Sequence, residues 1–494
     1  MIVFISDLHV GANVPLLASV EQGMSKLQRD LAPLQMQLSA GAVEGFYADL
    51  TRLAQDAGAR KVTLVLLGDI FDFIQTRVWL SRNTGQSPAW ASRDPDEGQV
   101  MDVLDHIVRD NRALFRAIAG RNCLSFLDVQ GKQQEIPLER VYVPGNHDRL
   151  CNKYPRARRF VDEALGLRRP LAEADFTWEF HDTDHRVFGR HGHVFDEENY
   201  AGTAAFTDDG HLRTPIGDLL TTEIASTLPD RVAATLDRLR HPPSATIKAE
   251  LKRDLEAMFS VPGLGTIKWF SKRIIGRWRG GKVLWASIVA LATLTWGFAR
   301  QCLERPRWFG RSWGQNTTWS LRATIGIPAL LGLLTVAGVA AWHGWALLHG
   351  PHSVLAPWLV AALVAAVALP AILWWPVFCR NPDSWLERGA GREAQQLNRE
   401  NPGCIRCIVY GHTHNALQKL LTVASGGSPV HYLNSGTWRQ IIDLAADDSE
   451  FASHKSLTYV AVYADAEQET RSRNGRSRQY FECWTGALRD DECF

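Results

Sequence analysis

The sequence has almost no net charge and no visible repeat, and these two absences narrow what the chain can be. Its 54 basic and 53 acidic residues leave a formal charge of +1 over 494 residues. A general nucleic-acid binder would be strongly basic, so no nucleic-acid partner is expected. No segment recurs at a period of about 20 to 50 residues, which excludes the usual signature of a solenoid or a propeller. The length instead predicts about two to four globular domains.

Eight cysteines do not form an obvious disulfide framework. Cys404 and Cys407 have the C-x-x-C spacing of zinc and redox motifs, but there is no second such pair, and this one leads straight into an apolar run ending at Tyr410. We therefore interpret both as packing residues of a strand. We expect no signal peptide, because Met1 enters the first apolar run directly. We expect a reduced catalytic domain that faces the cytoplasm.

Five short polar motifs stand in order along the chain. Most of them follow short apolar runs, at residues 2–5, 62–67, 141–143 and 405–410, which predict buried strands ending in loops. Open α/β sheets place their sites at the carboxyl ends of strands, so we expect these motifs to meet. The motifs are Asp7-Leu8-His9, Gly68-Asp69-Ile70-Phe71-Asp72, Gly145-Asn146-His147-Asp148, His191-Gly192-His193 and Gly411-His412-Thr413-His414.

Carboxylates, a carboxamide and imidazoles in this combination suit a pair of divalent metal ions. Two ions roughly 3.5–4 Å apart can clamp an in-line phosphoryl displacement. Mixed imidazole and carboxylate ligation favours Mn, Fe or Zn over Ca, and we expect Mn first among them. Asp69, on the glycine turn after a strand, is placed to bridge both ions. Asp7 and His9 lie two residues apart in an extended chain, so they share a face.

In order and in flanking residues the series resembles the calcineurin-like metallophosphoesterase superfamily, over residues 1 to about 200 and 400 to about 485. The resemblance implies a four-layer αββα sandwich that hydrolyses phosphoester, phosphodiester or pyrophosphate bonds. It implies one ion held by Asp7, His9 and His414, and a bridging carboxylate at Asp69. It also implies that a second ion is held by Asn146, His191 and His412.

Three further roles follow from the same resemblance. His147 would be the acid or charge stabiliser at the leaving oxygen. Asp72 and Asp148 would be carboxylates that orient the ligands rather than bind metal. The H-G-H sequence departs from the more frequent family forms, so His193 competes with His191 as a ligand. We prefer His191, because residues 186–190 are expected to form the strand that delivers it.

Acidic residues are almost absent from the long segment between the fourth and fifth motifs. From residue 257 to residue 382 the one acidic residue is Glu304. Within this segment, residues 325–348 and 354–378 carry no Asp, Glu, Lys or Arg, and tryptophans cluster toward their ends. Each run is long enough to span a bilayer, so we expect a transmembrane hairpin, with a pair of buried core helices as the alternative.

Residues 283–299 form a shorter apolar run with basic residues on both sides. Because the motifs before and after the insert must meet, the chain must cross a membrane an even number of times. Two long spans satisfy this, so we expect residues 267–309 to lie along anionic headgroups, or else to present an ordinary solvated face. The basic flanks indicate the cytoplasmic side of a bacterial inner or plasma membrane.

The predicted organisation follows from these segments. Residues 1–200 and 383–494 form the two parts of the metallophosphoesterase domain, 201–266 a helical cap or connector, and 267–382 the membrane region. Helices are expected at 45–57 and 100–119, and late strands at 457–463 and 480–484 are expected to extend the second sheet. The predicted function is hydrolysis of a phosphorylated small molecule or lipid. The alternatives are a nucleotide or cyclic-nucleotide phosphodiesterase tethered to the membrane, and a non-catalytic membrane scaffold.

Overall fold

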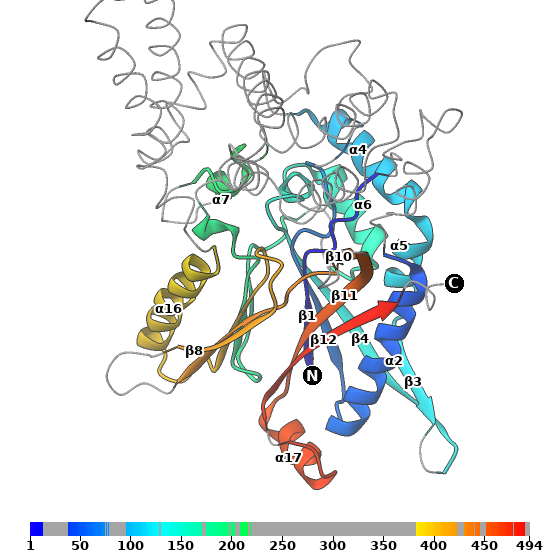
Figure 1. Ribbon diagram of the computed structural model, residues 1–494, viewed down its shortest axis with the longest axis vertical. Coiled ribbons are helices and arrows are strands. Elements are labelled where there is room, and N and C mark those ends of the chain that lie inside the picture. The colour runs from blue at the N-terminus through cyan, green and yellow to red at the C-terminus, as the bar shows by residue number, and fades with distance from the viewer. Residues whose placement is uncertain are drawn as a thin grey trace, which may run out of the picture.

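Two β-sheets lie face to face with helices on their outer sides (Figure 1). The computed structural model describes residues 1–12, 38–74, 76, 78, 95–127, 130–169, 174–196, 199–202, 208–215, 218, 382–421, 429–438, 440–444, 451–477 and 479–489.

The first sheet has seven strands in the order β10-β11-β1-β2-β4-β3, with β12 on the other side of β11. At its centre β1 (Ile2–Ile5), β2 (Val62–Leu67) and the second half of β4 (Gln133–Val143) run parallel. The remaining strands pair antiparallel, and they are β3 (Cys123–Leu127), β10 (Gln440–Leu444), β11 (Phe451–Val462) and β12 (Phe481–Arg489). This sheet therefore carries the first three motifs at one end of its parallel centre.

The second sheet has five strands in the order β5-β6-β7-β9-β8. Its parallel centre consists of β6 (Val187–Gly189), β7 (Cys407–Tyr410) and β9 (Val430–Asn434). The edge strands β5 (Phe180–Asp182) and β8 (Leu417–Leu421) pair antiparallel. The fourth and fifth motifs follow β6 and β7.

Alternate side chains of the central strands pack into two different hydrophobic cores, one on each face of the first sheet, because successive side chains of a strand point to opposite faces. On β1, Phe4 faces the second sheet and packs in one cluster with Val409, whereas Val3 faces the helices. Those helices are α2 (Ala40–Ala57), α4 (Glu97–Asp110), α5 (Arg112–Ala119) and α6 (Pro155–Leu165). A fully buried strand face on each side explains why these runs are apolar throughout.

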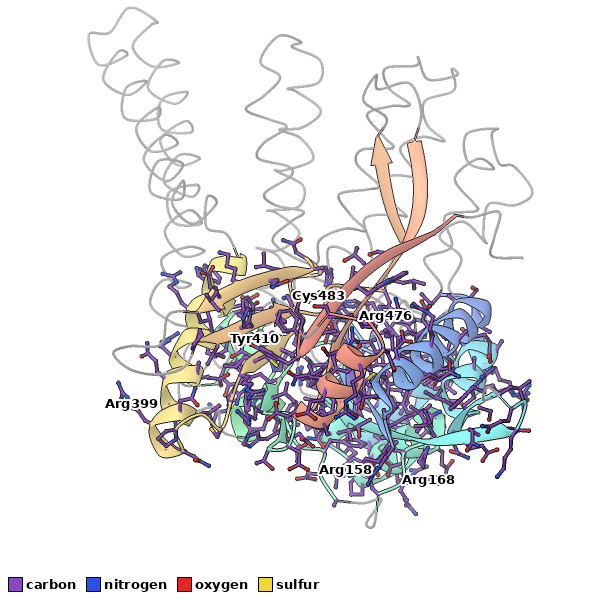
Figure 2. The ribbon with its side chains drawn as sticks, turned by 90° about the horizontal axis from the view of Figure 1, so that it is seen from below. Arg158, Arg168, Arg399, Tyr410, Arg476 and Cys483 are labelled. Carbon is purple, nitrogen blue, oxygen red and sulfur yellow. The ribbon has the colours of Figure 1, made fainter. Side chains whose placement is uncertain are left out.

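The outer face of the second sheet is covered by helix α16 (Pro382–Glu400). Ile408 and Tyr410 pack there against Leu386 and Ala390 of the helix. Tyr410 lies among the side chains between α16 and the sheet, whereas Arg399 projects outward from the end of that helix (Figure 2). The described residues therefore form four layers, αββα, and the mixed α/β class predicted from the sequence is confirmed.

The prediction that the last two strands extend the second sheet was wrong. β11 pairs antiparallel with β1, with Ile2 opposite Val462, and β12 pairs with β11. The reason is that β1 is buried along its whole length and has β2 on one side only. Its other edge carries buried backbone N–H and C=O groups that need a partner, which β11 supplies.

Two predicted helices also have different bounds. The helix expected at 100–119 is divided into α4 and α5 at Asn111, whose Nδ2 donates to the carbonyls of Ile107 (2.8 Å) and Gly11 (2.7 Å). Side-chain bonds of this kind compete with the helical ladder. The helix expected at 45–57 begins at Ala40, where the Ser39 side chain caps it by accepting from the N–H of Ala42.

The membrane segments predicted at 267–309, 325–348 and 354–378 lie outside the described residues, as does most of the predicted cap at 201–266. Of the helices that the structure describes, none combines the length and apolarity that crossing a bilayer requires.

The contact between the sheets predicts a difference between two glycine substitutions. A Cβ on Gly189 of β6 would lie 2.8 Å from Cε1 of Phe4, whereas one on Gly391 of α16 would meet nothing within 4 Å. Gly189→Ala should lower the free energy of unfolding by about 1–3 kcal/mol through overpacking. Gly391→Ala should raise it by about 0.5–1 kcal/mol, because alanine favours a helix. Urea unfolding followed by circular dichroism measures both, and equal stabilities would contradict the sheet packing.

Candidate metal centre

The carboxyl ends of the two parallel blocks meet at one end of the sandwich. β1, β2 and β4 of the first sheet lead into the motifs of Asp7, Asp69 and Asn146. β6 and β7 of the second sheet lead into those of His191 and His412. The sheets are joined there by side chains: Nε2 of His414 lies 3.2 Å from Oδ1 of Asp7. The meeting of the motifs that the sequence predicted is therefore present in the structure.

The backbone of the motifs is bent in an unusual way. Among the described residues, six other than glycine have a positive φ, and five of them belong to the motifs. Such conformations cost about 1–3 kcal/mol each and are kept where the surroundings enforce them. Backbone bonds between neighbouring loops enforce them here, for example from the N–H of His9 to the carbonyl of Asp69 (2.8 Å). The five residues are Asp7, His9, Asp69, His412 and His414.

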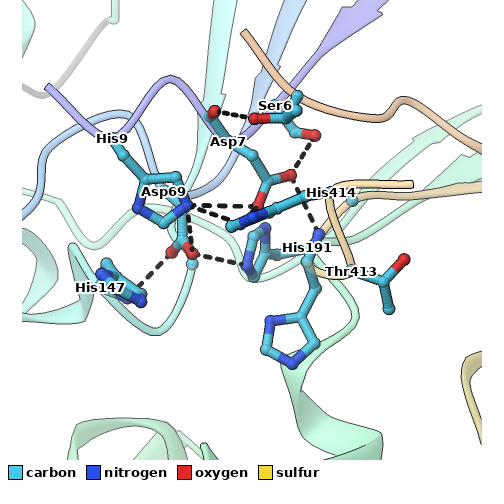
Figure 3. Close-up of polar contacts among 12 residues, drawn as sticks. Ser6, Asp7, His9, Asp69, His147, His191, Thr413 and His414 are labelled. Atoms are coloured by element: carbon cyan, nitrogen blue, oxygen red, sulfur yellow. Dashed lines mark hydrogen bonds and ion pairs between the residues drawn. The ribbon is translucent and has the colours of Figure 1, made fainter. Parts of the chain in front are cut away.

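One group of possible metal ligands consists of Asp7, His9 and His414. The Nε2 atoms of the two imidazoles lie 2.8 Å apart, and Nε2 of His9 lies 3.7 Å from Oδ1 of Asp7 (Figure 3). The other oxygen of Asp7 accepts from the hydroxyl of Ser6 and from the N–H of His412, the latter at 3.0 Å. These bonds turn Oδ1 toward the two histidines.

A second group consists of Asp69, His191 and His412. Nε2 of His191 lies 3.1 Å from Oδ2 of Asp69 and 3.2 Å from Oδ1 of Asn146. The other ring nitrogen, Nδ1, is held 2.9 Å from the carbonyl of Leu67, which fixes the orientation of the ring. Asn146 thus lies beside the second group.

Asp69 lies between the two groups. Its Oδ2 is 3.7 Å from Nε2 of His9 in addition to its contact with His191, and its Oδ1 accepts from the backbone N–H of His147 at 2.9 Å. Burial alone would raise the pKa of this carboxyl, but the surrounding imidazoles, His191 first, lower it far below its usual value. Asp69 is therefore an anion in contact with both groups.

His147 is buried beside two carboxylates. Its Nδ1 lies 3.0 Å from Oδ1 of Asp72, while Oδ2 of Asp72 lies 3.4 Å from Nδ1 of His9. Burial alone would lower the pKa of His147, but Asp72 and Asp69 raise it to about 9. His147 also lies within reach of His9 and Asp69 as a third possible ligand group. In the absence of added charge its ring is thus a cation at neutral pH, oriented by Asp72.

Asp148 contacts backbone rather than ligand side chains. Its Oδ1 accepts from the N–H of Gly145 at 2.6 Å, and its Oδ2 accepts from Ile70 at 2.7 Å and Phe71 at 3.3 Å. Burial and the nearby charge of Asp69 raise the pKa of Asp148 to about 6. The side chain therefore ties the loop after β4 to the loop after β2.

His193 lies next to the second group, with its ring centroid 5.5 Å from that of His191, but its Nε2 is engaged elsewhere. Its Nε2 lies 3.1 Å from Nδ1 of His211 in helix α7 (Asp208–Leu212), and the ring of Trp178 stacks on His211 at 4.1 Å. No group of possible ligands among the described residues includes His193. Between the two candidate histidines, the geometry therefore favours His191.

Some residues near the groups were not singled out from the sequence. Asp196 lies 3.0 Å from His412, and Asn199 accepts from Asn146 at 3.3 Å. Asp196 and Asn199 follow the H-G-H motif by only a few residues, which is the one signal that could have pointed to them.

The donors present fit a pair of divalent ions. Imidazole nitrogens and carboxylate oxygens converge within 4.8 Å in each group, and Asp69 is common to the second group and the His9–His147 group. Oδ1 of Asp7 is buried without a hydrogen-bond donor, although it faces two imidazoles. A buried anionic oxygen of this kind is costly unless a cation compensates it. The α/β sandwich and this donor set are together those expected of a metal-dependent hydrolase of phosphate esters.

Comparison with known proteins supports a phosphoesterase over the first part of the chain. Residues 1–215 match the family model described as calcineurin-like phosphoesterase. This match identifies a calcineurin-like phosphoesterase domain and makes the chain a phosphoesterase hydrolase. The matched residues include the first four motifs and end before His412 and His414. A search of the curated proteins found no relative.

The contacts of Asp148 predict a structural effect of its removal. Asp148→Ala leaves three buried N–H groups without their acceptor, and each unsatisfied donor costs about 1–3 kcal/mol. Relief of the repulsion from Asp69 offsets part of that loss, so we expect the free energy of unfolding to fall by about 2 kcal/mol. Asp148→Asn keeps an oxygen acceptor and should lose less. Thermal unfolding of both variants measures these losses. An Asp148→Ala variant as stable as wild type would show that Asp148 does not stabilise the two loops that it joins.

Proposed function

We propose that the chain hydrolyses a phosphoester bond at a binuclear centre. One ion would be held by Asp7, His9 and His414, and Asp69 would bridge. The second would be held by Asn146, His191 and His412. The observation that carries this proposal is the position of the Asp69 carboxylate, whose Oδ2 lies 3.7 Å from His9 of the first group and 3.1 Å from His191 of the second.

When bound, two divalent ions supply positive charge to the phosphoryl oxygens and activate water for in-line attack. The protein contributes fixed geometry. Ser6 and the N–H of His412 hold one oxygen of Asp7, and the carbonyl of Leu67 holds the far side of the His191 ring. All three bonds orient a ligand through the atom that does not face the site, which tunes its basicity and position. We expect Mn²⁺ to serve best, with Fe or Zn as alternatives.

His147 is proposed to act at the leaving oxygen. Its Nδ1 is engaged by Asp72 at 3.0 Å, so Nε2 is the nitrogen that remains to donate a proton or to stabilise developing charge. The carboxylates of Asp72 and Asp69 favour the protonated ring that this role requires. Asp72 would thus act through His147 and His9, and Asp148 through the two loops that it joins.

Loss of the bridging carboxylate should abolish turnover. We expect Asp69→Ala to reduce Mn²⁺-dependent hydrolysis of generic phosphomonoesters and phosphodiesters by more than about 100-fold, because loss of an outer partner of a ligand already costs 10–100-fold. Excess chelator should do the same to wild type. Asp49→Ala, which removes an exposed carboxylate of α2, is the control.

Two results would count against a catalytic centre. Equal activity of Asp69→Ala and wild type, or full activity in excess chelator, would contradict it directly. A chain that binds about two ions yet turns over no ester in the panel would favour a non-catalytic membrane scaffold, in which the ions serve only structure.

We further propose that this centre works at the cytoplasmic face of a membrane on a lipid-linked substrate. The support is in the sequence: two long uncharged segments at 325–348 and 354–378, and a basic, tryptophan-rich segment at 267–309. Uncharged runs of about 24 residues partition into bilayers, and basic segments attract anionic headgroups. A phosphate or pyrophosphate group on a lipid would then lie near the centre without leaving the surface.

Substrate profiling distinguishes this proposal from a tethered nucleotide phosphodiesterase. The full chain with Mn²⁺ is incubated with a bacterial lipid extract, and products are identified by mass spectrometry. Loss of a phosphorylated or pyrophosphate-linked lipid is expected in wild type and not in Asp69→Ala. An unchanged lipid profile together with rapid turnover of nucleotides or cyclic nucleotides would favour the alternative.

A further inference from the structure

Asp196 lies beside the second ligand group, just beyond the 3-10 helix η3 (His193–Phe195). Its Oδ2 is 3.0 Å from Nε2 of His412, and both side chains are largely buried, at 13% and 8% exposure. The same oxygen accepts from Nδ2 of Asn199 at 2.8 Å. Oδ1 of Asn199 in turn accepts from Nδ2 of Asn146 at 3.3 Å. One chain of contacts therefore links His412 to Asn146.

The contacts between Asp196, Asn199 and Asn146 determine how the two side-chain amides are oriented. A carboxamide can present either its oxygen or its nitrogen to a site, and only the oxygen binds a metal ion. With Nδ2 of Asn146 donating to Asn199, Oδ1 is turned toward His191, 3.2 Å away. The amide of Asn199 is oriented by its own bond to Asp196. Asp196 is thus the anion that determines which way both amides face.

His412 is oriented by the same carboxylate. An imidazole that binds a metal through one nitrogen usually donates its other N–H to a carboxylate or a carbonyl. Because Nε2 of His412 faces Asp196, Nδ1 is the nitrogen left for an ion. A tight turn fixes the carboxylate itself, since the N–H of Asp196 donates to the carbonyl of His193 at 2.9 Å and the N–H of Asn199 to that of Asp196 at 3.0 Å.

We propose that Asp196 is a positioning residue for the second metal ion, acting directly through His412 and, by way of Asn199, through Asn146. This inference rests on the proposed function, because it takes both residues to be ligands of that ion. The contacts of Asp196 with His412 and Asn199 both lead to proposed ligands of the second ion. Removal of the Asp196 side chain should therefore lower the affinity for the second ion and leave the affinity for the first ion unchanged.

Metal binding, measured without substrate, tests the inference. The full-length chain is stripped of metal with chelator and then titrated with Mn²⁺. Electron paramagnetic resonance measures the free Mn²⁺ that remains, and the separate resonance of two spin-coupled Mn²⁺ ions reports that both sites of one protein molecule are filled. Wild type should bind two ions. Asp196→Ala should bind the second ion about 10–100-fold more weakly, with the first ion unchanged. Asn199→Ala should lower the affinity for the second ion less, because it removes only the contact that leads to Asn146 and leaves the contact between Asp196 and His412.

Two further variants control for folding and for the loss of any carboxylate. Asp196→Asn keeps an acceptor oxygen without the charge, so it should retain the fold and fall between wild type and Asp196→Ala in second-ion affinity. Asp182→Ala removes a carboxylate that contacts a different histidine, His185, at 2.9 Å, at the far end of β6 from the site. Its metal binding should match wild type.

The outcomes separate this inference from the proposal beneath it. Two ions in wild type and unchanged second-ion affinity in Asp196→Ala would overturn the role of Asp196 alone. Equal weakening of both ions in Asp196→Ala and Asp196→Asn would overturn it too, since it would indicate a general loss of structure. Failure of wild type to bind a pair of ions would overturn the binuclear centre and this inference together.

Discussion

The buried charge of Asp69 is the constraint on which the rest of the site depends. A carboxylate that is 1% exposed remains ionised only where cations or hydrogen-bond donors surround it. The imidazoles of His191 and His9 approach the Asp69 carboxylate from the ends of two different sheets, and the backbone N–H of His147 donates to it from a third loop. The loops must therefore approach closely. At Gly145 a side chain would collide with Asp69, so this motif has to begin with glycine.

The same demand explains the bent backbone of the motifs. Side chains within a strand stand roughly perpendicular to the sheet, whereas these side chains follow the strand ends and must turn to converge on a point between two sheets. The left-handed conformation of Asp7, Asp69 and His412 provides that turn. Bonds between neighbouring loops compensate for the cost and hold the loops in this geometry.

The strands and the motifs could be predicted from the sequence because their signals are local. Apolar runs such as 2–5 and 62–67 are buried on both faces, and the polar residues that follow are forced to the strand ends. The pairing of β11 with β1 could not be predicted, because an apolar run does not specify which edge it joins. Asp196 was missed for a related reason. It contacts His412, 216 residues further along the chain, and belongs to none of the five motifs.

The separation between the two halves of the site has a consequence for biosynthesis. His9 and His414 face each other at 2.8 Å across 405 residues of sequence, and His414 lies on a strand-end loop of the last part of the chain. On the ribosome, Asp7 and His9 emerge long before their partners are made. The complete set of donors exists only after the C-terminal strands have been translated and have docked beside β1. In the proposed centre, His412 and His414 each belong to one of the two ligand groups, so a chain terminated before residue 412 would lack a ligand of both ions.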